Sequence, residues 1–384
     1  MFWRKQGVAF SQPLPGAKPR APGQTTRVSL AGVERGASPG SLKSAVRAAA
    51  ESATNFSWLS RGDAVFIKPA LNSGNPYPAT TSPEAIGAVV EMLKEKGARR
   101  VLVGDMCGIE HVKLSQEGLS GSSRSLMEAS GMARAAQEAG AELHFFEEAG
   151  WAAFYEDFPA AGSHWNQGLM MPSILKEVDH IVLMPRCSRH VLAGSTLGLK
   201  AAVGYWRTDT RLEYHRDAST FQEKTAEGNT VNTLLKKQRL VLSAADKILT
   251  TFGPDKGFVF QPEIGLVMAS ESVAAHDMVS LAWLLENRLS VPSPEKEGFK
   301  DPYGSQVMVS AANHWVVSKL GGLGQAIGSE RLNRNDINTI WDDRVLNRAY
   351  QVFGGMPSVI LDAANAVVPE ALKKRLAEWT SPKA

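Results

Sequence analysis

Short apolar segments alternate with helical patterns along the chain. In the first half, apolar segments lie at 64–67, 101–103 and 142–146, and helical patterns at 41–56, 82–96 and 126–139. Later, a helix is expected at 230–245, a strand at 264–268, and helices at 274–286 and 306–320. Strand, helix and strand joined by short connections are typical of a parallel sheet with right-handed crossovers. The alternation therefore predicts an α/β fold.

The length of the chain limits how this fold is divided. A single hydrophobic core stops growing at roughly 250–300 residues, and this chain has 384. We therefore expect two lobes with mainly parallel sheets, flanking helices and a cleft between them, the first at 41–175 and the second, with a C-terminal helical region, at 176–384. Because residues 11–40 are rich in Pro, Gly and Ser, residues 1–40 are expected to be a flexible lead-in with at most a short strand at 26–30.

Composition excludes several classes of function. The net charge is only +3 and the basic residues form no runs, so we expect a small anionic molecule as the partner and no nucleic acid. Two cysteines, Cys107 and Cys187, are too few for an iron–sulfur cluster, which needs about four thiolates. No apolar stretch approaches the ~20 residues of a transmembrane helix, and the amino terminus lacks a signal-peptide core. We expect a cytoplasmic protein without a membrane partner; whether it forms a homo-oligomer stays open.

Two histidines and a lysine follow one predicted strand closely. The apolar run IVLMP, at 181–185, ends in proline, so 186–194 is expected to be the loop at the carboxyl end of a strand. His190, Lys200 and His215 follow at spacings of ten and fifteen residues. Ligands of open α/β sheets bind at this edge. The segment is therefore the first candidate for a site.

Each of these side chains has a functional and an ordinary interpretation. Lys200 lies among apolar residues, which would desolvate it, lower its pKa and free the amine for covalent chemistry; it could equally be a lysine that extends from an apolar helix into water. His190 exchanges protons near pH 7 or is a hydrogen-bonded structural group. His215 is a ligand or part of a solvated, charged surface. Arg186 and Arg189 could each form bidentate hydrogen bonds to a carboxylate or phosphate, or they are ordinary charged residues of a loop.

Polar residues also follow two other predicted strands. After 64–67 come Lys68, Asn72 and Thr81, just before a helix that opens at 82. Amide and hydroxyl donors at a helix amino terminus suit a carboxylate or phosphate, and these three are candidate cofactor-binding residues. The alternative is a turn followed by a helix cap.

The strand at 101–103 is followed by a carboxylate, a thiol and an imidazole. Asp105 and His111 are the catalytic candidates there, and Cys107 is more typical of a small buried side chain than of a reactive thiol. Asp277 opens a later helix. It either favours the helix dipole or orients a group of the site.

The pattern H-x-x-x-G-(S/T)-x-x-x-x-K at 190–200, together with IKPALNSGNPYPATTSPEAI and GARRVLVGD upstream, resembles the DUF362 family over 65–283. Asp277 corresponds to the aspartate of an A-x-D stretch common in that family, and Asp105 also fits it. Some members carry a ferredoxin segment, which this chain lacks.

More distantly, the spacing is similar to that of the lactate racemase family, in which the corresponding lysine carries a nickel-pincer nucleotide. The resemblance implies that Lys200 tethers this nucleotide, that His215 binds nickel, and that His190 and His111 are acid/base groups on opposite faces of a 2-hydroxy acid. Leu197-Gly198-Leu199 stands where the racemases have a glycine pair. The cofactor is left open between this nucleotide and a divalent metal held by His215 and His190.

Two functions follow. The first is an enzyme, an isomerase or oxidoreductase that acts on a small hydroxy acid or related anion, with a cofactor or metal in the cleft. The second is a non-catalytic accessory protein that binds an anion or serves an iron–sulfur or redox partner.

Overall fold

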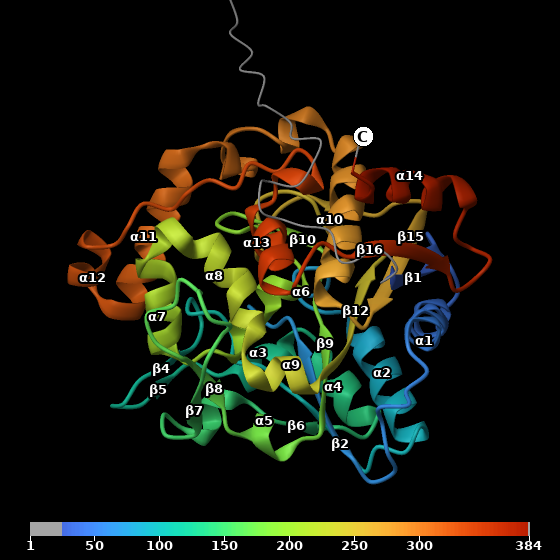
Figure 1. The fold of residues 1–384 in the computed structure, drawn as a ribbon, viewed down its shortest axis with the longest axis horizontal. Helices are drawn as coiled ribbons and strands as arrows, with labels where there is room; N and C mark the ends of the chain where they lie inside the picture. Colours follow the sequence, from blue (N-terminus) through green and yellow to red (C-terminus); the bar gives the residue numbers. More distant parts are fainter. Residues whose placement is uncertain (1–24, 383–384) are drawn as a thin grey trace, which may run out of the picture.

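The structure is a computed structural model that describes residues 25–382, so the expected lead-in over 1–24 lies outside the described residues. A mixed sheet of eight strands forms its centre, in the order β16-β1-β15-β12-β9-β2-β3-β6 (Figure 1). Five neighbouring pairs are parallel, and the two pairs that include β15 are antiparallel. The strands are β1 (Thr25–Glu34), β2 (Ala64–Pro69), β3 (Arg100–Val103), β6 (Glu142–Leu143), β9 (His180–Met184), β12 (Gln238–Ala245), β15 (Ile264–Ser270) and β16 (Ser358–Ala363). The predicted α/β class is confirmed.

Helices cover both faces of this sheet. The principal ones are α1 (Ser41–Ala53), α2 (Pro83–Glu95), α3 (Ser123–Ala129), α4 (Met132–Glu138), α5 (Ile174–Glu177), α6 (Gly198–Ala201), α7 (Thr208–Arg216), α8 (Phe221–Glu227), α9 (Asn232–Lys237), α10 (Val273–Leu289), α11 (Gln306–Gly321), α12 (Leu323–Ile327), α13 (Arg344–Val352) and α14 (Glu370–Thr380). Two small sheets have two strands each: β4 (Lys113–Leu114) pairs with β5 (Leu119–Ser120), and β7 (Phe154–Asp157) pairs with β8 (Leu169–Pro172). A third small sheet has four strands, in the order β11 (Gly194–Thr196), β10 (Ser188–His190), β13 (Ile248–Leu249) and β14 (Val259–Phe260).

Alternating side chains divide the interior into two cores. In β1, Val28 and Leu30 belong to one hydrophobic cluster, and Ala31 and Val33 belong to the other. This is the period of two expected of a strand that is buried on both faces. Helices α1, α2 and α4 contribute to the Ala31 cluster, whereas α10, α13 and α14 contribute to the Val28 cluster (Figure 1). The two clusters are therefore the two faces of one sheet.

The backbone differs from two expectations. The short strand expected at 26–30 is present but is longer than expected: β1 has ten residues and pairs with β15 and β16 in the central sheet. Instead of one helix over 230–245, α9 ends at Lys237 and the chain continues as β12, between β9 and β15. The apolar run after Lys237 is buried in the sheet, and this pairing overrides its helical pattern. The sheet also crosses the expected boundary at residue 175, so the division into two lobes stays a prediction.

The topology brings three strand ends together. Strands β9, β2 and β3 are parallel neighbours, so the loops after Met184, Pro69 and Val103 leave the sheet at the same edge. These are the loops that carry most of the polar residues identified in the sequence. Among the described residues, no helix is long and apolar enough to cross a membrane.

Gly104 allows the loop after β3 to leave the sheet in close contact with the chain after β6. A Cβ atom at Gly104 would lie 1.6 Å from the carbonyl oxygen of His144. We expect Gly104→Ala to lower the free energy of unfolding by roughly 1–3 kcal/mol, because the backbone must shift. Denaturant unfolding measures this. Gly324→Ala is the control, since its Cβ would meet nothing within 4 Å; equal unfolding midpoints for the two variants would contradict the packing described.

Candidate functional site

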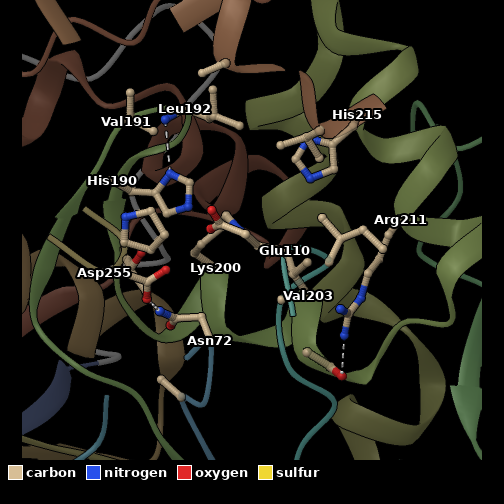
Figure 2. Close-up of a pocket in the computed structure, with 18 of the residues that line it drawn as sticks. Asn72, Glu110, His190, Val191, Leu192, Lys200, Val203, Arg211, His215 and Asp255 are labelled. Carbon is tan, nitrogen blue, oxygen red and sulfur yellow. Dashed lines mark hydrogen bonds between the residues drawn. The ribbon is translucent and has the colours of Figure 1, made fainter. Parts of the chain in front are cut away.

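A cavity of about 490 Å³ lies at the carboxyl edge of β9, β2 and β3. The loops after these three strands line it, together with α6, α7, the loop at 252–255 and one side of α11 (Figure 2). Seven of the residues proposed from the sequence line the cavity, namely Lys68, Asn72, Asp105, Arg186, His190, Lys200 and His215. Four others do not, namely Thr81, His111, Arg189 and Asp277.

His190 is held by two backbone hydrogen bonds. Its Nδ1 accepts from the N–H groups of Leu192 at 3.0 Å and Ala193 at 3.2 Å. Since Nδ1 is the acceptor, the proton of the neutral ring is assigned to Nε2. Burial, and then the positive charges of Lys200 and Arg186, hold the pKa of His190 well below its usual value. In this arrangement His190 is a neutral donor through Nε2, which leaves no lone pair there for a metal.

His215 has the opposite tautomer. Its Nδ1 lies 2.9 Å from the side-chain oxygen of Asn313, whose amide nitrogen donates to the His215 carbonyl and so fixes which atom is oxygen. Nδ1 therefore donates, and Nε2 has a free lone pair. Burial lowers the pKa of His215 to about 3, although the Asn313 hydrogen bond opposes this. His215 is thus a neutral acceptor or metal ligand, on buried helix α7 and not on the solvated surface that was the alternative.

Lys200 lies between the two histidines in the view of Figure 2. Helix α6 carries it, and among the described residues its amine has no hydrogen-bond or ion-pair partner; Nζ lies over the Tyr214 ring, 5.7 Å from the ring centroid. Burial, followed by the charges of Arg211, Arg186 and Lys68, lowers the pKa of Lys200 to about 7. A large fraction of the amine is therefore neutral near pH 7, which a lysine nucleophile requires.

Asp277 positions the helix that carries Lys200. Its carboxylate accepts from the N–H groups of Gly198 at 2.8 Å and Leu199 at 2.7 Å, the first residues of α6. A Cβ atom at Gly198 would lie 2.8 Å from this carboxylate, so the contact requires the glycine. Asp277 is therefore a positioning residue, outside the cavity, and not a direct cofactor ligand.

Thr81 and Arg189 are also used within the protein. The Thr81 hydroxyl donates to the Met184 carbonyl at 2.6 Å and accepts from the Ala70 N–H at 2.8 Å, which ties the loop after β2 to the end of β9. Arg189 stacks over the Tyr303 ring at 4.0 Å. Both side chains therefore have structural roles next to the cavity.

Two cationic side chains at the cavity are satisfied internally. Lys68 and Asp105 form a buried ion pair at 2.9 Å. Burial lowers the pKa of Lys68 and raises that of Asp105, and their mutual attraction opposes both effects. Arg211 donates to four backbone carbonyls, including those of Cys107 at 2.6 Å and Met106 at 2.8 Å. These groups shape the cavity and supply positive charge but have little capacity left for a ligand.

Arg186 differs from these groups. Its side chain is 1% exposed, and Nη1 donates to the carbonyls of Ala79 and Pro254. Nε and Nη2 are buried with no hydrogen-bond partner among the described residues. Burial lowers the pKa of Arg186 to about 10, whereas the charge of Asp255 opposes this. Two buried donor nitrogens of this cavity-lining residue therefore have no partner among the described residues.

His111 lies on an exposed turn after β3, next to Glu110. One ligand atom each of Glu110, His111 and Asp255 lie within 4.8 Å of one another. Among the described residues, this is the group of three or more His, Cys, Asp and Glu side chains with the spacing of a metal site; His190 and His215 belong to no such group.

Several residues that line the cavity or orient its side chains were not predicted from the sequence. Arg211 stands four residues before His215 on α7, and this helical spacing could have identified it. Glu110, adjacent to His111, could have been found in the same way. Asp255 and Asn313 carry no local signal, because only the tertiary fold brings them to this edge.

The pKa of Lys200 is open to direct measurement. We expect acylation of Lys200, followed by peptide mass spectrometry, to rise with pH with a midpoint near 7, since the neutral amine reacts and protonation protects it. Arg186→Met should move the midpoint upward, because it removes a neighbouring positive charge. A Lys200 midpoint near the ordinary lysine value of ~10.4 would contradict this description of the cavity.

Comparisons with solved structures found distant similarity. The lactate racemase apoprotein from Thermoanaerobacterium thermosaccharolyticum is 12% identical over 67% of this chain and 56% of that chain, with a TM-score of 0.39. A protein from Thermotoga maritima is 12% identical over 56% of this chain and 52% of that one, with a TM-score of 0.33. The chain thus spans little more than half of either protein. No curated protein matches it.

A family comparison gives a more specific result. Residues 65–282 match the model of DUF362, a domain of unknown function. The matched segment contains β2, β3, β9, α6 and α7, which position Lys68, Asp105, Arg186, Lys200 and His215. Because this match covers more than half of the sequence, the chain belongs to the DUF362 family.

Proposed function

We propose that the cavity binds a small anionic molecule, of the hydroxy-acid type, and that the protein is an enzyme in which proton transfer and a reactive amine meet at this molecule. One observation carries the binding part, namely the two unpartnered N–H donors of buried Arg186. A buried guanidinium is costly unless charged or polar acceptors satisfy it. A carboxylate accepts two parallel N–H hydrogen bonds from arginine and would supply both acceptors.

The histidine tautomers support the catalytic part. His190 offers a proton through Nε2 and His215 offers a lone pair through Nε2, and both rings are neutral at pH 7. A hydroxyl group of the bound molecule can donate to His215, while an oxygen that gains negative charge can accept from His190. This pair of roles suits an isomerase or oxidoreductase that moves a proton next to a carbonyl or hydroxyl carbon.

The residues fit the nickel-pincer nucleotide that the lactate racemase resemblance implies. The free amine of Lys200 would hold the nucleotide covalently, and the lone pair of His215 would then ligate the nickel instead of accepting from the hydroxyl, with Asn313 as the outer hydrogen-bond partner that orients the ring. Such a group, when bound, supplies a hydride acceptor. His190 and Arg186 would then orient the substrate, and Arg186 would balance its charge.

Arg186→Met tests the binding part. We expect calorimetric titration of lactate to give at least a tenfold weaker Kd for the variant, because two charge-assisted hydrogen bonds, each worth about 1.5–3 kcal/mol, are lost. Arg134→Met is the matched control, since Arg134 is exposed and forms an ion pair with Glu138 on the surface. Equal affinity of Arg186→Met and the control protein would overturn the proposal.

Intact mass tests the covalent part. Protein purified from its own source should carry an added mass of several hundred daltons on the peptide that contains Lys200, and Lys200→Arg produced in the same host should have its unmodified mass, because a guanidinium is not a nucleophile at neutral pH. An unmodified wild-type protein from its own source that still binds lactate would instead favour the alternative, a non-catalytic anion-binding accessory protein.

A further inference from the structure

We propose that Glu110, His111 and Asp255 bind a divalent transition-metal ion at the mouth of the cavity, and that this ion completes the site for the anionic molecule. The second half of this inference rests on the proposed function; the metal site itself does not. Ligand atoms of the three side chains lie within 4.8 Å of one another. Glu110 and Asp255 line the cavity, and Glu110 and His111 are exposed, so the group stands where the cavity opens to solvent.

The loops that carry these side chains are fixed by hydrogen bonds. Asn72 donates to the carboxylate of Asp255 (Figure 2), and Arg186 donates to the carbonyl of Pro254, the preceding residue. On the other side, the N–H of His111 donates to the Gly108 carbonyl at 3.0 Å. The three ligands are therefore held near one another by two loops far apart in the sequence.

The charges at this mouth are unbalanced without a cation. No described Lys, Arg or His side chain forms an ion pair with Glu110 or Asp255, although the two carboxylates face the same small region. The free Arg186 donors call for an anion in the same cavity, and Arg186 is close enough to Asp255 for the Asp255 charge to affect it. An anion held there would be repelled by both carboxylates. A divalent ion between them converts this repulsion into attraction.

The ligand types select the class of metal. An imidazole nitrogen disfavours Mg²⁺ and Ca²⁺, which prefer oxygen ligands, and favours ions such as Zn²⁺. Three protein ligands with a fourth position open to water or substrate are typical of catalytic zinc sites. An oxygen of the anionic molecule would take this open position while Arg186 binds its carboxylate. His111 is then a metal ligand and not an acid/base group.

Calorimetric titration of the metal-free full-length chain with Zn²⁺ tests the site. We expect one Zn²⁺ per chain, and at least tenfold weaker binding in each of Glu110→Gln, His111→Ala and Asp255→Asn. Glu117→Gln, an exposed carboxylate nearby in the sequence, is the control and should bind as the wild type does. Thermal unfolding verifies that each variant is folded; since His111 is exposed, its variant should melt as the wild type does. Unchanged Zn²⁺ affinity in the three variants would overturn the site.

Lactate titrations with and without Zn²⁺ separate the two proposals. We expect Zn²⁺ to tighten lactate binding severalfold in the wild type and to have no such effect in His111→Ala, whose side chain does not line the cavity. Arg186→Met should lose lactate binding and still bind one Zn²⁺ per chain, with at most a modest loss of affinity from the missing hydrogen bond to Pro254. Lactate binding without any Zn²⁺ binding would sink the metal site and leave the proposed function standing. Zn²⁺ binding without lactate binding would overturn the proposed function and leave the metal site standing. A lactate affinity that is the same with and without bound Zn²⁺ would refute the coupling between the two.

Discussion

The guanidinium of Arg186 lies at the carboxyl edge of the sheet, and two of its nitrogens have no partner within residues 25–382; the assignment of an anionic ligand to the cavity depends on this. Neighbouring cations have internal partners: Asp105 neutralises Lys68, and backbone carbonyls surround Arg211. Burial and the neighbouring positive charges lower the pKa of Lys200 to about 7, so a large fraction of its amine is neutral near pH 7. The positive charges around the cavity thus have two effects. They lower the pKa of Lys200, and they favour an anionic ligand that could accept from Arg186.

Two residues outside the cavity and the backbone beside it orient the reactive groups. Asp277 accepts hydrogen bonds from the first residues of the short helix that carries Lys200. Asn313 of α11 accepts from Nδ1 of His215 and so orients that ring. The backbone after His190 orients the other imidazole ring, because two N–H groups donate to its Nδ1. The opposite protonation of the two imidazoles is thus a consequence of local hydrogen bonds and not of pH.

Sequence patterns identified the part of the site that local order determines. The apolar run at 181–185 with its terminal proline, and the parallel alternation around it, are sufficient to bring Lys68, Asp105 and Lys200 to one edge of a sheet. Patterns could not distinguish Thr81, whose hydroxyl is used between two loops, from a ligand-binding threonine. Nothing local marks Asp255. The pattern at 230–245 predicts a helix because it carries no information about the pairing of β12 with β9 and β15.

A crystal structure of the protein with lactate tests the central claim most directly. The account predicts that the carboxylate oxygens lie about 2.7–3.1 Å from Nε and Nη2 of Arg186, with the hydroxyl oriented toward the two imidazoles. A cavity without lactate at saturating concentration, or a lactate bound elsewhere while Nε and Nη2 of Arg186 bond to protein groups, would contradict it.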